Sequence, residues 1–128
     1  MIRIPKKMSF RICVYPSDQV RKGLIAHSLD LDIMGTGNSI QEALDELLEL
    51  IEHHIQVCQE HDAQFEFPAP EEVWEKYEIA RKKNRRVPME LLERVINTAN
   101  KRLGHTAPLF DKVLASEGLP EEYLVTAS

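Results

Sequence analysis

Hydrophobic residues occupy every second position of residues 8–15, a period typical of a strand with one face buried. They are Met8, Phe10, Ile12 and Val14. Residues 16–23 contain proline, serine, aspartate and glycine, which predicts a hairpin loop. Residues 24–29 then return as an antiparallel strand, and residues 33–36 form a third short strand.

From residue 40 the hydrophobic spacing changes to three or four residues, which predicts one buried face of a helix about 20 residues long. This face contains Ala43, Leu44, Leu47, Leu48, Ile51, Ile55 and Cys58. We expect it to cover one face of the sheet. The opposite face carries Asp45, Glu46, Glu49 and Glu52 with no lysine or arginine in the helix, so it is either solvated or faces a basic partner.

A glycine-rich turn joins the third strand to this helix. Gly35 and Gly37 permit a sharp exit from the strand because they lack a side chain. Ser39 and Glu42 have the spacing of a capping box, in which each side chain accepts a hydrogen bond from a backbone N–H at the helix start. These four residues are predicted to build the turn and the helix cap.

The rest of the chain is punctuated by prolines. Pro68 and Pro70 end a possible short edge strand at 64–67 and mark a boundary. The pattern after this boundary predicts helices at 71–86, 89–103 and 108–116.

These elements predict an α+β fold with a three- or four-stranded antiparallel sheet covered on one face by the long helix. Residues 1–70 would form the α+β domain and residues 71–128 a helical C-terminal extension. Such a sheet leaves one face and its edges open, so we expect the chain to form a homo-oligomer.

The composition indicates a globular protein. The chain has 128 residues, of which 43% are hydrophobic and 29% charged. It has no apolar run of the roughly 20 residues that cross a bilayer, and its basic N-terminus lacks a signal-peptide pattern. We therefore expect a cytoplasmic protein without a membrane contact, in which Cys13 and Cys58 are reduced.

The net charge of −5 hides a strong separation along the chain. Residues 38–80 carry −11, whereas residues 81–102 carry +6. The basic segment contains Arg81, Lys82, Lys83, Arg85 and Arg86, which are candidate nucleic-acid-binding residues because such a run attracts phosphates. The alternative is a solvated helix end that balances an acidic helix of this or a neighbouring subunit.

The residues at 35–44, GTGNSIQEAL, match the pattern G-x-G-[NDT]-[ST]-x-x-EAL. With the strand order before it, this segment resembles the HicB-like antitoxin family over roughly residues 8–70. The resemblance implies a small α+β domain that binds and occludes a ribonuclease toxin, often with a C-terminal segment that binds DNA and represses its own operon. Residues 86–95 resemble the start of the ribbon-helix-helix unit found in some relatives, although residues 81–86 lack the alternation of its strand.

Two residue sets have metal-ligand chemistry, and each has a structural alternative. Asp30, Asp32 and Glu42 could hold a divalent cation, but they also suit a turn and a helix cap. The spacing of His54, Cys58 and His61 could supply zinc ligands on one helix face, although Cys58 falls on the hydrophobic face. His27 is isolated in the second strand, so we assign no catalytic residue, no metal and no cofactor.

The sequence therefore favours a non-enzymatic HicB-like protein, either antitoxin-type or a stand-alone relative. It would act through protein contacts with a small toxin ribonuclease and through DNA binding by its C-terminal part, without a small-molecule substrate. One alternative is a homo-oligomeric interaction module with no toxin and no nucleic-acid role. A metal-dependent nuclease is the third.

Overall fold

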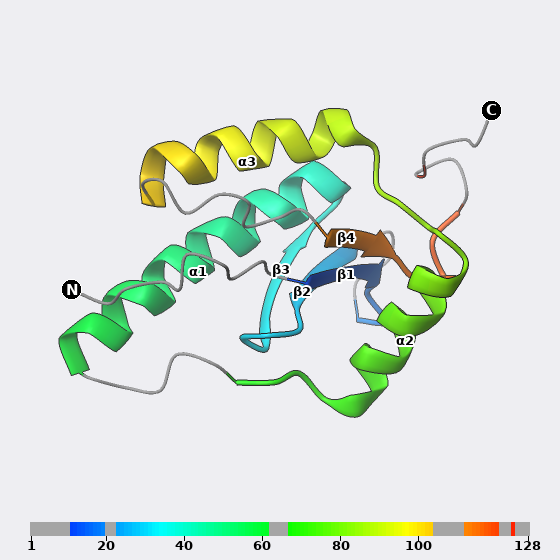
Figure 1. The fold of residues 1–128 in the computed structure, drawn as a ribbon, viewed down its shortest axis with the longest axis horizontal. Helices are drawn as coiled ribbons and strands as arrows, with labels where there is room; N and C mark the ends of the chain where they lie inside the picture. The colour runs from blue at the N-terminus through cyan, green and yellow to red at the C-terminus, as the bar shows by residue number, and fades with distance from the viewer. Residues whose placement is uncertain (1–10, 20–22, 62–66, 104–111, 121–123, 125–128) are drawn as a thin grey trace.

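The computed structural model describes residues 11–19, 23–61, 67–103, 112–120 and 124. Within these residues one four-stranded sheet lies among three helices (Figure 1). The strands are β1 (Arg11–Pro16), β2 (Leu24–Ser28), β3 (Ile33–Gly37) and β4 (Lys112–Ala115). The helices are α1 (Ile40–His61), α2 (Glu71–Lys82) and α3 (Met89–Leu103).

The sheet has the strand order β3-β2-β1-β4. β1, β2 and β3 form an antiparallel meander in which Cys13 lies opposite His27, and His27 opposite Met34. β4 pairs with the free edge of β1 in parallel, with Ile12 opposite Val113. The expected α+β class is confirmed, with the fourth strand parallel to β1 instead of antiparallel.

β4 lies in a segment that the sequence predicted to be a helix. The pattern predicted a helix over 108–116, and this is wrong for residues 112–115, which form the strand. The segment after residue 70 is therefore helical in α2 and α3 but also completes the sheet. The predicted edge strand at 64–67 lies mostly outside the described residues, and Phe67 itself is not in a strand.

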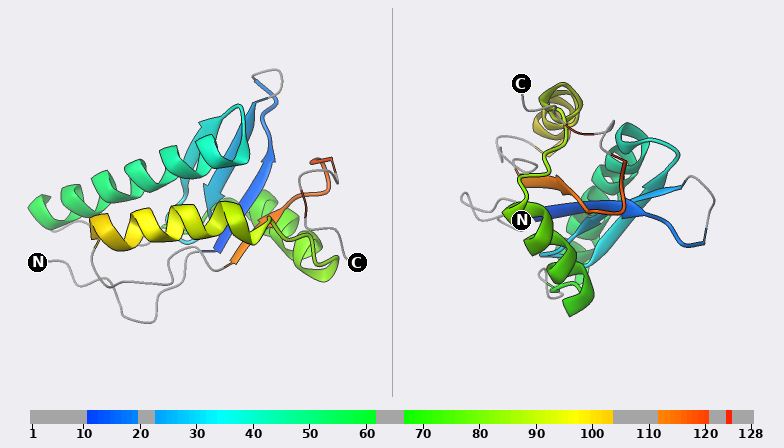
Figure 2. Two further views of the ribbon diagram at one scale, coloured as in Figure 1. Left: turned by 90° about the horizontal axis from the view of Figure 1, so that it is seen from above. Right: turned by 90° about the vertical axis from the view of Figure 1, so that its right-hand side faces the viewer.

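The main hydrophobic core lies between one face of the sheet and the helices α1 and α3 (Figure 2). Ile12 and Val14 of β1 and Leu24 and Ala26 of β2 point into it. α1 and α3 contribute buried aliphatic residues, namely Leu44, Leu47, Leu48, Ile51, Leu92 and Val95. The period-two and helical patterns in the sequence thus identify the same core.

The second face of the sheet is covered by α2 where β1 and β4 lie. Cys13, on the strand position between Ile12 and Val14, packs with Val73 and Tyr77 of this helix. The guanidinium carbon of Arg11 also lies over the ring of Trp74 in α2, 4.6 Å from the centroid of that ring. The expectation of an uncovered face is therefore wrong for β1 and β4, which α2 covers, whereas Met34 of β3 on the same face remains 49% exposed.

β3 and α1 are in backbone contact at the glycines of the turn. A Cβ atom added to Gly35 would lie 2.3 Å from the carbonyl oxygen of Ala43 and 2.4 Å from the backbone nitrogen of Leu47. A Cβ atom added to Gly37 would lie 2.5 Å from the Cβ atom of Glu42. The glycines are thus required because no side chain fits between the strand and the helix.

Candidate functional site

The predicted helix cap is present at the start of α1. The Ser39 hydroxyl oxygen accepts a hydrogen bond from the Glu42 N–H at 3.1 Å. The Glu42 carboxylate accepts one from the Asn38 N–H at 2.8 Å, one residue before the Ser39 N–H that a standard capping box uses. Gly35, Gly37, Ser39 and Glu42 are therefore brought together, and each holds the strand-to-helix joint.

The outward side of α1 next to this joint is acidic. Glu46 accepts hydrogen bonds from the N–H and the hydroxyl group of Thr36, and so covers part of the outer edge of β3. Asp45 and Glu49 are exposed. In the described part of the chain, no ion pair joins Glu42, Asp45 or Glu49 to a lysine or arginine.

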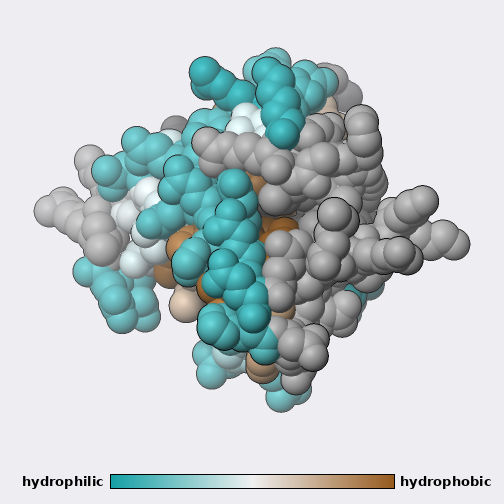
Figure 3. Space-filling model, turned by 90° about the vertical axis from the view of Figure 1, so that its left-hand side faces the viewer, coloured by the Kyte–Doolittle hydropathy of each residue, from teal (hydrophilic) through white to brown (hydrophobic). Residues whose placement is uncertain are grey.

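We call the exposed side of α1 that carries Glu42, Asp45 and Glu49 the acidic face. These three residues are exposed to solvent, and no lysine or arginine among the described residues neutralises their negative charge. Hydrophilic residues make up most of the described surface on the side of the molecule that Figure 3 shows, with smaller hydrophobic areas among them.

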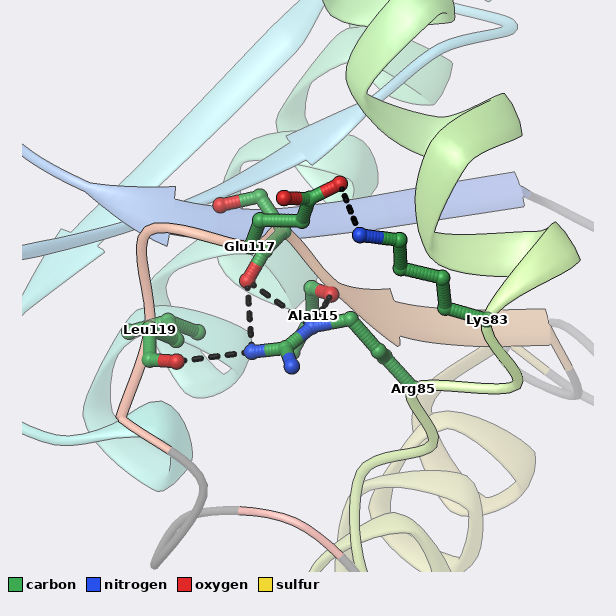
Figure 4. Close-up of polar contacts among 6 residues, drawn as sticks. Lys83, Arg85, Ala115, Glu117 and Leu119 are labelled. Atoms are coloured by element: carbon green, nitrogen blue, oxygen red, sulfur yellow. Dashed lines mark hydrogen bonds and ion pairs between the residues drawn. The ribbon is translucent and has the colours of Figure 1, made fainter.

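The basic segment is divided by the structure into residues with different roles. The Arg85 guanidinium donates hydrogen bonds to the backbone carbonyls of Ala115 at 3.1 Å, Ser116 at 3.0 Å and Leu119 at 2.7 Å (Figure 4). It therefore fixes the chain after β4 to the end of α2. Beside it, Lys83 forms an ion pair of 2.8 Å with Glu117.

Arg81 is also engaged, since its guanidinium donates to Glu78 at 2.9 Å, and this hydrogen bond raises the pKa of Arg81. Lys82 and Arg86 are exposed, and neither has an ion pair among the described residues. Three of the five predicted residues thus bind neighbouring groups of this chain. The charged groups of the other two, Lys82 and Arg86, have no ion-pair partner among the described residues.

The backbone around Arg86 bears on the ribbon-helix-helix alternative. α2 continues to Lys82, and Arg86 forms an antiparallel bridge with Leu114 of the same chain. The Ala115 N–H donates to the carbonyl of Arg85 at 2.9 Å. This segment therefore pairs within its own chain and is not free to form the intersubunit ribbon of that unit.

A groove of about 650 Å³ opens between the end of α2, the start of α3 and β4. Its polar lining includes the arginines Arg11, Arg81 and Arg86, and we call it the arginine groove. Its hydrophobic lining includes Val87, Met89, Leu92, Val113 and Leu114. The sequence identified two of these arginines as candidates, but it missed Arg11, which is 70 positions before Arg81 and joins them only through the pairing of β1 with β4.

A polar network on the α2 side of the sheet was also missed. The Tyr15 hydroxyl lies 2.8 Å from Nδ1 of His27, and Nε2 of His27 lies 2.7 Å from Oδ1 of Asp32. His27 is only 3% exposed, and Asp32 has a φ of 53°, in the left-handed region. The cross-strand register, which the sequence does not state, brings these three residues together.

The contacts of this network join three parts of the fold. Burial, helped by the nearby Cys13 and Asp32, raises the pKa of Tyr15 to about 12, so its hydroxyl stays protonated and is a poor nucleophile at neutral pH. Lys76 of α2 lies 4.3 Å from the ring centroid of Tyr15 and covers it. The three side chains therefore tie β1, β2 and the turn before β3 to one another.

The two sets of possible metal ligands are placed differently. Asp30 accepts hydrogen bonds from the Arg11 backbone N–H at 2.9 Å and from its guanidinium at 2.7 Å, and this contact raises the pKa of Arg11. Cys58 lies 3.6 Å from Nε2 of His54. Within the described residues, no three His, Cys, Asp or Glu side chains are arranged to hold a metal ion.

In comparisons with known proteins, no family model, no curated protein and no solved structure matches the chain. Of the helices that the structure describes, none combines the length and the hydrophobicity needed to cross a membrane.

Proposed function

We propose that the chain is a non-enzymatic, HicB-like binding protein of the antitoxin type, which holds a basic protein partner on the acidic face of α1. The proposal rests on the resemblance of residues 35–44 to that family. It is supported by the way these residues join β3 to a capped α1, because the motif then builds the scaffold that presents the acidic face.

The observation that carries the proposal is the uncompensated charge of the acidic face. Asp45 and Glu49 are exposed, and residues 38–80 as a whole carry a net charge of −11. A field of one sign over a surface steers a partner of opposite charge and sets its orientation. A lysine- or arginine-rich protein surface is the complementary partner.

A ribonuclease fits this chemistry. An enzyme that binds RNA needs cations to hold the phosphates, so its substrate surface is basic. A rigid helix that displays carboxylates can occupy the same surface and exclude RNA. The binding protein needs no catalytic group of its own for this action.

The test is co-expression with the product of a reading frame adjacent to the gene for this chain. We expect a small basic protein that inhibits growth alone, is neutralised by this chain and co-purifies with it. The double variant Asp45→Lys/Glu49→Lys should weaken the complex at least about tenfold, because it reverses the charge at the contact. Glu72→Lys/Glu75→Lys is the matched control, since both residues are exposed on α2.

Equal effects of the two double variants would reject the acidic face as the contact. The absence of any complex at low salt would reject the antitoxin proposal. A dimer or larger assembly of this chain alone, measured by light scattering, would then support the homo-oligomeric module.

DNA binding by the basic segment is the second candidate function. The observation that favours it is the exposure of Lys82 and Arg86 without an ion pair among the described residues. A mobility shift of the promoter region that weakens with salt and with Lys82→Gln would support this role. No shift at low salt would reject it.

A further inference from the structure

The arginine groove has the size of a small-molecule site. Its volume of about 650 Å³ falls within the range of about 300–1,000 Å³ typical of ligand pockets. It lies by β4, the edge strand at the opposite end of the sheet from β3, and its lining includes no residue of the acidic face of α1. A ligand could therefore bind there independently of the protein partner proposed above.

The floor of the groove is hydrophobic. Val87, Leu92 and Val113 line it and are between 2% and 5% exposed, so they belong to the main core and present a fixed surface. Met89 lies on the lining and, at 62%, is the most exposed of the large hydrophobic side chains that the structure describes. An apolar ligand body would remove the Met89 side chain from water, which favours binding.

The charges around this floor favour one negative group. Arg11 is neutralised by Asp30 at 2.7 Å, and Arg81 by Glu78 at 2.9 Å. In the part of the chain that the structure describes, no carboxylate pairs with Arg86. Arg86 is therefore the one uncompensated cation among the three arginines, and its planar guanidinium suits a two-point contact with a carboxylate, phosphate or sulfonate.

We propose that the arginine groove binds a small organic monoanion with an apolar body, whose acid group contacts Arg86 and whose body covers Met89 and the floor. A nucleic acid fits this groove less well, because a polyanion would also meet Glu78 and would leave the hydrophobic floor without a partner. The ligand class thus follows from one free cation beside a hydrophobic surface.

The test uses two fluorescent probes of similar shape, anilinonaphthalene sulfonate, which carries one negative charge, and neutral N-phenylnaphthylamine. We expect the sulfonate to bind the full chain at one saturable site, with chemical-shift changes at Val87, Met89 and Val113 in an NMR titration. Arg86→Gln should raise the Kd for the sulfonate about tenfold and leave that for the neutral probe unchanged. Decanoate should displace the sulfonate from the wild type.

Arg94→Gln is the matched control, because Arg94 is exposed on α3 and does not line the groove. Its Kd for the sulfonate should equal that of the wild type. Equal weakening by Arg86→Gln and Arg94→Gln would overturn the proposal, as would shift changes outside the groove. Displacement of the probe by a single-stranded oligonucleotide but not by decanoate would assign the groove to nucleic acid and also overturn it.

Discussion

The Arg85 guanidinium donates a hydrogen bond to the carbonyl oxygen of Leu119 at 2.7 Å, and so connects the end of α2 to the chain beyond β4. The same guanidinium holds the carbonyls of Ala115 and Ser116. Arg85 is half-buried by these contacts. A residue that resembles its basic neighbours in sequence thus has a role in holding β4 in the sheet.

Replacing Arg85 should destabilise the protein. We expect Arg85→Ala to lower the free energy of unfolding by about 2–3 kcal/mol, because it removes charged hydrogen bonds and leaves backbone carbonyls unsatisfied. Lys82→Ala, an exposed neighbour, should change it by less than about 0.5 kcal/mol. Urea denaturation of both variants measures the difference, and equal values would show that the Arg85 contacts contribute no net stability.

Gly35 should be among the least replaceable residues of the chain. Gly35→Ala places a Cβ atom against the backbone of α1, which cannot move without separating the helix from β3, so we expect a loss of at least about 3 kcal/mol or failure to fold. Gly118→Ala is the comparison, since its Cβ atom would lie farther from its neighbours, 3.2 and 3.3 Å from ring atoms of Pro16 and 3.6 Å from the Ser116 hydroxyl oxygen. Thermal unfolding that ranks the two variants equally would contradict the close contact at Gly35.

The Ser39 cap should contribute a measurable part of the stability of α1. Ser39→Ala removes the oxygen that accepts the Glu42 N–H, and we expect a loss of about 1 kcal/mol. Ser39→Asp retains an acceptor and should unfold at nearly the wild-type urea concentration. A Ser39→Asp variant as unstable as Ser39→Ala would argue against this capping interaction.

Alkaline pH should weaken the fold through Tyr15. Its pKa rises from 10.0 to about 12 in the folded protein, so the folded state holds this proton more tightly than the unfolded chain does. The resulting stabilisation is complete below pH 10 and is lost as the pH rises toward 12. Tyr15→Phe lacks this term, so its free energy of unfolding should fall less steeply than that of the wild type over this range. Parallel pH profiles would contradict the shift.

The thiols should be protected in the native protein. Burial raises the pKa of Cys13 to about 12, so almost no thiolate forms near neutral pH, and Cys58 is only 1% exposed. Iodoacetamide at about pH 8 should leave the folded chain unmodified and label both cysteines in urea, as measured by mass spectrometry. Rapid labelling of Cys13 in the folded chain would show that the α2 side of the sheet opens readily.

The local elements of this fold could be predicted from the sequence because each depends on neighbours along the chain. The period-two pattern identified β1, and the glycine turn, the cap and the hydrophobic spacing identified α1. β4 could not be found in this way, because its few apolar residues fit a helix as well as a strand, and its partner β1 is distant in sequence.

The candidate site shows the same division between local and distant information. Arg81 and Arg86 were evident as part of a basic run, but their grouping with Arg11 depends on the pairing of β1 with β4. His27 had no visible partner in the sequence, since Tyr15 reaches it only through the register of the hairpin. The separate role of Arg85 required the position of the chain after β4.

The parallel pairing of β4 with β1 also has a consequence for how the chain is made. In this pairing Arg11 lies opposite Lys112. The ribosome therefore synthesises α1, α2 and α3 before β4, the second strand that pairs with β1. Until then the nascent chain presents a strand edge with unpaired N–H and C=O groups, which can associate with other chains. Closing so long a loop is slow, and the period before it closes is when a chaperone would be of most use to this protein.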